Sequence, residues 1–111
     1  MNDFVAGFVG TSNIIERDGR RSTIRPEKIR LLLDGAVPPP GASSEEGLVR
    51  EVVYLGSVTR YLVELDRGET LVVVRQNLET SAEEALAERG RRVRVAWRPQ
   101  DASALDRREL E

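Results

Sequence analysis

The chain has 111 residues, of which 40% are hydrophobic and 32% charged, and its formal net charge is −2. This length suits one domain with one core, and the composition is that of a soluble globular protein. The absence of cysteine and histidine excludes disulfide scaffolds, thiolate zinc sites and Ser-His-Asp or Cys-His nucleophile systems. We expect a single domain over residues 1–111 that needs no metal or cofactor.

The first 13 residues, MNDFVAGFVGTSN, lack the basic start of a secretory signal, and two glycines interrupt their apolar part. Phe4 to Ile15 is compatible with a short helix or a strand. No apolar run approaches the roughly 20 residues that cross a bilayer. We therefore expect a cytoplasmic protein without direct membrane insertion.

Residues 1–36 are predicted to form N-terminal strands. Thr23 to Arg25 and Ile29 to Leu33 are short apolar pieces separated by Pro-Glu-Lys, where the proline favours a single helical turn or a bend. Three prolines followed by small polar residues then predict a linker loop over residues 37–47.

Residues 48–98 are predicted to hold the main barrel strands. Val58 to Leu65 alternates between an apolar and a mixed face, which indicates a half-buried strand. Asp66-Arg67-Gly68 is typical of a hairpin loop that ends in a left-handed glycine, so Glu69 to Arg75 should return antiparallel. Leu71 to Val74 is apolar on both faces, which predicts a central or covered strand.

A short helix is predicted next, because Ser81 and Glu84 have the spacing of a capping box and Gly90 suits a helix end. Arg92 to Trp97 alternates again and indicates a strand with one wet face. Residues 99–111 are interpreted as a C-terminal tail. The whole pattern predicts a mainly β fold, a small OB-like antiparallel β-barrel with one short helix.

The sequence contains neither a GxxxxGK[ST] phosphate loop nor a GxGxxG turn. Glu45-Glu46 and Glu83-Glu84 are interpreted as solvated charges rather than as acid and base pairs. We therefore expect no catalytic residue, and the chain itself should not be an enzyme.

Four segments carry a family resemblance: FVGTSNII, TIRPEKIRL, VREVVYLGSVTRYLVEL and RGETLVVVRQN. Together they resemble the TOBE domain, a transport-associated relative of the OB-fold at the C-terminus of ATP-binding subunits of bacterial ABC importers of the spermidine/putrescine type. The chain departs from the family between FVG and RPE, where several strands are usual and only a few residues lie here. Unpaired strand edges would then need a partner or a cover.

The resemblance implies a cytoplasmic accessory domain, peripheral to the inner membrane through the transporter complex. ATP would be bound by a preceding ATPase domain, so the chain would be a detached domain or a fragment. The implied partners are that ATPase domain, the membrane subunits and a second copy in a homodimer. The candidate contact or motif residues are Arg25, Glu27, Tyr54, Gly56, Arg60 and Val72, for which turn stabilisation and barrel packing remain an open alternative.

Two other functions stay open. One is a module that binds a small oxyanion of the molybdate type, for which Ser57, Thr59 and Arg60 are the available donors. The other is an oligonucleotide-binding OB-fold, which would need aromatic side chains in a basic groove. Aromatic residues make up only 5% of this acidic chain, so we expect no nucleic-acid partner.

Overall fold

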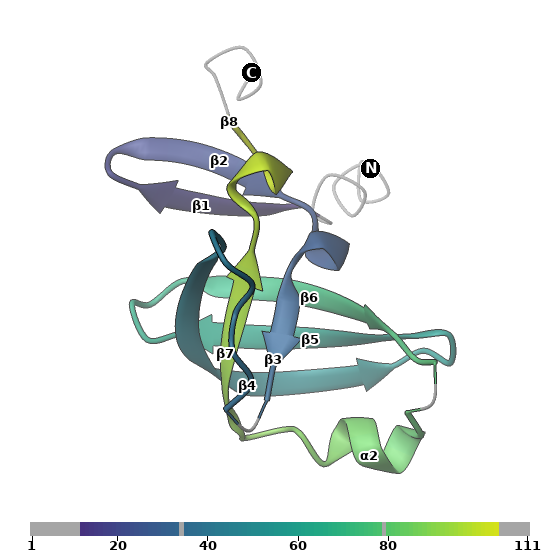
Figure 1. Ribbon diagram of the computed structural model, residues 1–111. Coiled ribbons are helices and arrows are strands. Elements are labelled where there is room, and N and C mark those ends of the chain that lie inside the picture. Colours follow the sequence, from purple (N-terminus) through teal and green to yellow (C-terminus); the bar gives the residue numbers. More distant parts are fainter. Residues whose placement is uncertain (1–11, 34, 79, 105–111) are drawn as a thin grey trace, which may run out of the picture.

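The computed structural model describes residues 12–33, 35–78 and 80–104. Within these ranges the chain is mainly β, with one short α-helix, as predicted (Figure 1). The elements are β1 (Asn13–Arg17), β2 (Arg20–Ile24), the 3₁₀ turn η1 (Pro26–Lys28), β3 (Arg30–Leu32), β4 (Ser43–Tyr54), β5 (Val58–Leu65), β6 (Thr70–Gln76), α2 (Ala82–Leu86), β7 (Arg92–Trp97), η2 (Pro99–Asp101) and β8 (Ala102–Ala104).

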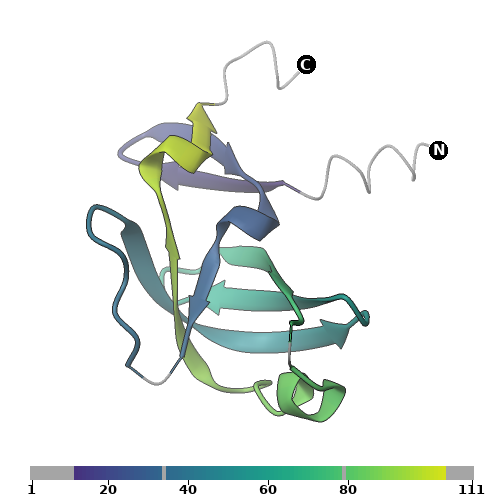
Figure 2. The ribbon, with the colours of Figure 1, turned by 45° about the vertical axis from the view of Figure 1, so that its right-hand side comes forward.

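The strands form two antiparallel sheets. A five-stranded sheet has the order β3-β7-β4-β5-β6, and a three-stranded sheet has the order β1-β2-β8. The larger sheet curls into a half-barrel, and the smaller one lies across one end of it (Figures 1 and 2). Strand pairing within the described residues does not join β3 to β6, so the curl of this OB-like sheet stays open between these two strands.

The N-terminal part agrees with the prediction around the proline. Strand β2, η1 and β3 follow one another, and Pro26 is buried at the start of the turn. Strand β1 was not predicted separately; it pairs with β2 through a tight turn at Asp18 and Gly19, which both have positive φ angles, 55° and 78°. Most of the ambiguous segment from Phe4 to Ile15 lies outside the described residues.

Strand β4 corrects the predicted linker. It begins at Ser43, so only residues 37–42 of the expected loop lie outside regular strands. The first half of β4 pairs with β7 and most of its length pairs with β5, which requires the strand to bend. A register shift between Val49 and Glu51 marks a β-bulge at this bend.

Gly47 lies just before the bulge, opposite Leu65 on one side and Val93 on the other. A Cβ atom at Gly47 would lie 2.6 Å from the carbonyl oxygen of Glu64. Backbone therefore approaches backbone at this corner, and only glycine fits. Gly56 has a φ of 91° and lies in the tight turn that joins β4 to β5.

The hairpin of β5 and β6 agrees with the prediction. Thr59, Tyr61, Val63 and Leu65 are buried and the alternate residues of β5 face outward. Gly68 closes the turn with a φ of 112°, and its N–H donates to the carbonyl of Leu65 over 2.8 Å.

The helix and the last strands are also defined. Ser81 and Glu84 form the predicted capping box at the start of α2, and Gly90 has the positive φ, 87°, expected after a helix. In β7, Val93, Val95 and Trp97 are buried as predicted. The expected tail is in part structured, because residues 99–104 form η2 and β8 and β8 pairs with β2.

Both sheets contribute to one apolar core. Its fully buried members include Ile24 from the small sheet and Val63, Leu71 and Val95 from the half-barrel. The core fixes the relative position of η1 and η2, which lie at the junction of the two sheets.

Candidate functional site

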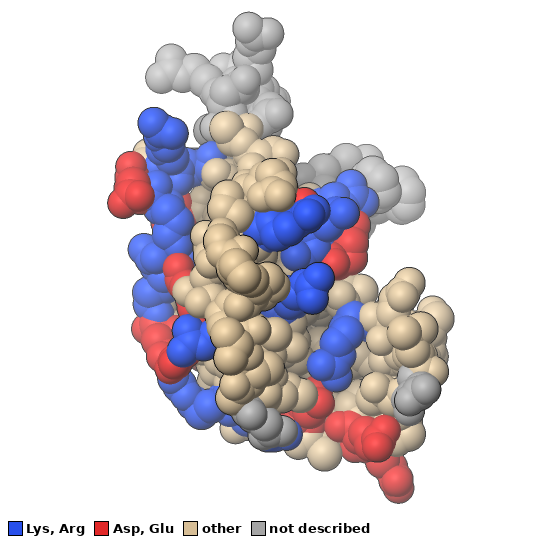
Figure 3. Space-filling view, in the orientation of Figure 1, with Lys and Arg blue, Asp and Glu red and all other residues tan. Residues whose placement is uncertain are grey.

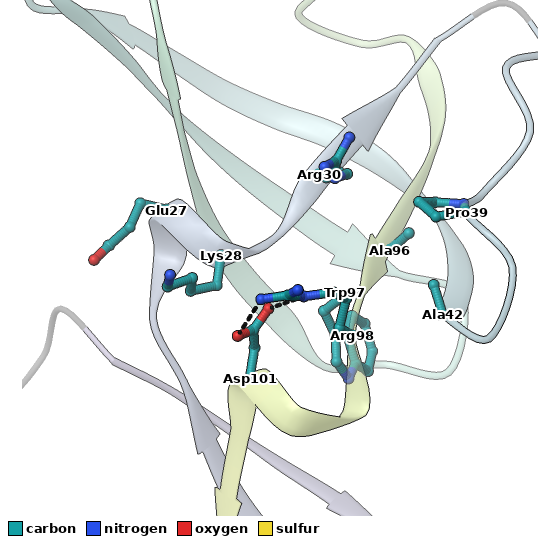
Figure 4. A pocket seen from close by; sticks show the side chains of 9 residues that line it. All are labelled: Glu27, Lys28, Arg30, Pro39, Ala42, Ala96, Trp97, Arg98 and Asp101. Carbon is teal, nitrogen blue, oxygen red and sulfur yellow. Dashed lines mark hydrogen bonds and ion pairs between the residues drawn. The ribbon is translucent and has the colours of Figure 1, made fainter.

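A cavity of about 300 Å³ lies where η1 and β3 face β7 and η2 (Figure 4). The loop before β4 forms its remaining wall. The lining residues are Glu27, Lys28, Arg30, Pro39, Ala42, Ala96, Trp97, Arg98 and Asp101. Of the predicted contact residues, Glu27 lines this cavity and Arg25 adjoins it.

Two ion pairs organise the charges around the cavity. Nε of Arg25 donates to Glu27 over 2.7 Å, and this bond holds the pKa of Glu27 below its usual value. The guanidinium of Arg98 donates to both carboxylate oxygens of Asp101, over 3.0 and 3.2 Å, and lowers the pKa of Asp101 in the same way. Both carboxylates therefore stay ionised and are already matched by a cation.

Tyr54 and Gly56 lie at the other end of the half-barrel. Tyr54 is the last residue of β4, and Gly56 lies in the turn between β4 and β5. The hydroxyl of Tyr54 donates to the carbonyl of Thr80 over 3.2 Å. The side chain of Asn77 donates to the carbonyl of Gly56 over 2.9 Å and accepts from the hydroxyl of Thr59 over 2.6 Å. The YLGS and RQN motifs are thus joined through Gly56 and Asn77.

Arg60 and Val72 lie together on the outer side of the curled sheet. Cross-strand pairing places Arg60 between Val53 and Val74, and it places Leu62 beside Val72. We call the surface of these five side chains the outer face. Val53 is 45% exposed, and Leu62, Val72 and Val74 are partly exposed, so the outer face presents apolar area around one arginine.

The three oxyanion donors considered from the sequence do not converge. Thr59 is fully buried, and its hydroxyl is engaged by Asn77. Arg60 is exposed on the opposite face of β5, so its guanidinium cannot meet the hydroxyl of Thr59 at one ligand.

Two partly buried polar clusters were missed by the sequence analysis. In the first, Arg17 pairs with Glu45 over 2.7 Å and with Glu69 over 2.9 Å, and it lies 5.9 Å from the centre of the Trp97 ring. These residues are far apart in the sequence, so only the topology joins them. Glu45 is therefore neither a linker charge nor one of an acid and base pair.

The second cluster lies under α2. Arg75 donates to the hydroxyl of Tyr61 over 2.8 Å and pairs with Glu88 over 3.3 Å. Burial raises the pKa of Tyr61 to about 12. The cluster attaches the helical segment to β5 and β6.

Comparison with known families decides the classification. The family model described as the TOBE domain matches residues 23–105. The chain belongs to the TOBE domain family. This match spans every strand from β3 to β8 and the end of β2 at Thr23 and Ile24, so the resemblance predicted from the motifs is confirmed.

Curated relatives of this TOBE domain are transporter ATP-binding proteins. The chain is 36% identical to the spermidine/putrescine import ATP-binding protein PotA of Thermobifida fusca, over 92% of the chain and 33% of the relative. It is also 36% identical to the uncharacterized ABC transporter ATP-binding protein YdcT of Escherichia coli, over 85% of the chain and 28% of the relative. The chain thus spans about a third of the length of these relatives.

A solved structure shares the fold. The cytoplasmic molybdate-binding protein ModG, with molybdate bound, superposes with a TM-score of 0.63 at 14% identity, over 76% of this chain and 59% of that one. At this identity the likeness establishes the fold alone, and it confirms the predicted OB-like architecture.

The described residues contain no helix that is long and apolar enough to cross a membrane. Nor do they contain a group of three or more Asp or Glu side chains arranged to hold a metal ion.

Proposed function

We propose that this TOBE domain is an accessory and subunit-contact domain of an ABC importer ATPase that serves polyamines or a related small solute. The observation that carries the proposal is the family match over residues 23–105, together with relatives that are themselves import ATP-binding proteins about three times as long. In this proposal the domain acts in the cytoplasm, held near the inner membrane by an ATPase domain and membrane subunits.

The domain contributes no catalysis in this proposal, because the sequence holds no phosphate loop. We expect ATP with magnesium neither to bind nor to be hydrolysed by the isolated chain. Thermal melting with increasing ATP, against magnesium alone, measures binding, and phosphate release measures hydrolysis. A saturable rise in melting temperature caused by ATP would contradict this expectation.

The outer face is the proposed surface for contact between two copies of the domain. Its apolar side chains surround Arg60, and interface centres favour apolar residues and arginine over other charged residues. A two-fold contact would let one such patch meet its own copy.

Replacing Val72 with lysine is expected to weaken association about tenfold or more while the fold persists, because a charge would be buried in the contact but not in the monomer. The partial exposure of Val72 on the outer face of β6 makes this the expected outcome rather than unfolding. Light scattering behind a sizing column, over a wide range of concentrations, measures the mass.

Gln76→Lys is the matched control, since Gln76 is exposed on the same face at the end of β6. It should leave the association unchanged. A wild-type chain that stays monomeric at the highest concentration would contradict the dimer.

A second candidate function is the binding of a small oxyanion, which the shared fold with molybdate-binding ModG favours. Ser57, Thr59 and Arg60 do not converge, so such a site would have to use other residues. Calorimetry with molybdate and sulfate tests this function, and heat that saturates with molybdate would support it over the subunit-contact role alone.

A further inference from the structure

Two positively charged side chains that line the cavity of Figure 4 take no part in the ion pairs around it. Glu27 is paired with Arg25, and Asp101 is paired with Arg98. Lys28 and Arg30 also line the cavity, and neither makes an ion pair within the part of the chain that the structure describes. In a chain with a net charge of −2, this is a local excess of positive charge.

The local fold places both cations on the same side. Ile29, between them, is 3% exposed and belongs to the core, whereas Lys28 and Arg30 are exposed. Lys28 ends η1 and Arg30 begins β3, on either side of the extended Ile29, and both line the cavity. Space-filling Figure 3 shows basic side chains gathered over η1, η2 and β3, with acidic ones near α2.

Small side chains create the space between these walls. Ala96 lies directly opposite Arg30 in the pairing of β3 with β7. Pro39 and Ala42 contribute further small apolar surface from the loop before β4. A larger side chain at position 96 would reduce this volume.

We propose that this cavity binds a small organic anion that carries two or more carboxylate or phosphate groups. One anionic group pairs with Arg30, whose planar guanidinium matches carboxylate or phosphate oxygens, and a second pairs with the ammonium of Lys28. The carbon skeleton of the ligand lies against Ala96, Pro39 and Ala42. The proposal does not depend on the subunit-contact role, since the outer face is a different surface.

The dimensions favour an organic ligand over a simple oxyanion. About 300 Å³ is at the lower end of the volumes that hold small molecules. A single tetrahedral oxyanion would fill only part of this space, and it would leave the apolar wall uncovered. A ligand with two separated charges can reach both cations at once, which a monovalent anion cannot.

Titration with amide NMR detection tests the proposal, with citrate, a sugar bisphosphate and inorganic phosphate as probes at constant ionic strength. We expect saturable shifts concentrated at Lys28, Arg30, Ala42 and Arg98. At least one of the two organic probes should bind about tenfold more tightly than inorganic phosphate, because its second anionic group adds a second charge-assisted hydrogen bond. Which organic probe binds more tightly identifies the ligand as a polycarboxylate or a phosphate ester.

The double variant Lys28→Gln/Arg30→Gln should weaken that binding by about tenfold or more, while its thermal melt stays near that of the wild type because both side chains are exposed. Arg20→Gln, which removes an exposed arginine of β2 that lines neither the cavity nor the outer face, is the matched control and should leave the affinity for the organic probe unchanged. Equal affinity for inorganic phosphate, shifts scattered over the surface, or an unchanged double variant would each overturn the proposal. The comparison of probes on the wild type decides the matter even if the double variant fails to fold.

Discussion

Gly47→Ala is expected to lower the free energy of unfolding by about 3 kcal/mol, the upper part of the usual range for overpacking a core. The added Cβ would lie 2.6 Å from the carbonyl oxygen of Glu64 and 3.0 Å from a methyl group of Val63. Backbone cannot turn aside as a flexible side chain can, so β4 would have to move away from β5 at the corner of the half-barrel. A lower melting temperature, by about 10 °C for a domain of this size, should accompany the loss.

Gly41→Ala is the matched control. Gly41 has a φ of 80°, but a Cβ there would meet nothing within 4 Å. Its replacement should therefore cost only about 1 kcal/mol for the left-handed backbone. Urea unfolding of both variants measures the two losses in unfolding free energy and so separates the cost of close packing from the cost of backbone strain. Equal losses would show that the corner at Gly47 can relax around an alanine.

The strands were predictable where one face is buried and the other is wet. The alternation in β5 and β7 and the turn at Gly68 depend on neighbouring residues, and such local patterns are visible in a sequence. The capping box of α2 is local in the same sense. The topology could not be predicted from local patterns, because the pairing of β8 with β2 joins residues about 80 positions apart.

The errors also have physical causes. Ser43 to Glu46 is polar and was assigned to a loop, but pairing with β7 and ion pairs such as that between Arg94 and Glu46, at 2.6 Å, hold it as a strand. Tertiary contacts override local propensity in such a segment. The hairpin of β1 and β2 was missed although the sequence contains a signal for it, since Asp-Gly, here Asp18-Gly19, is a frequent two-residue hairpin turn.

Motif resemblance led to Tyr54 and Gly56, whose role as contact residues stays a prediction. In the structure Gly56 is hydrogen-bonded to Asn77, and Tyr54 to Thr80. The same reasoning did not find the cavity, because Lys28, Ala96 and Arg98 carry no shared motif. They become neighbours only when β3 pairs with β7.

Asn13→Ala is expected to lower the free energy of unfolding by about 2 kcal/mol, since it leaves partly buried backbone groups without partners. The side-chain amide of Asn13 donates to the carbonyl of Val72 over 2.8 Å and accepts from the N–H of Val72 over 2.7 Å. It thereby takes the place of a neighbouring strand at the edge of β6. The sequence analysis led us to expect unpaired strand edges. The side chain of Asn13 covers part of one such edge, that of β6 at Val72.

Hydrogen exchange at the amide of Val72 measures this role directly. Protection there should fall more than at Val63, which lies in the middle of the sheet and pairs on both sides. Ile14→Ala is the control, because Ile14 is 57% exposed and its removal should change stability by less than about 0.5 kcal/mol. Unchanged protection at Val72 in Asn13→Ala would show that the edge is covered by something other than the Asn13 amide. If the uncovered edge instead pairs with a second chain, the variant should also associate more strongly than the wild type as its concentration rises, because free N–H and C=O groups on an edge strand recruit another strand.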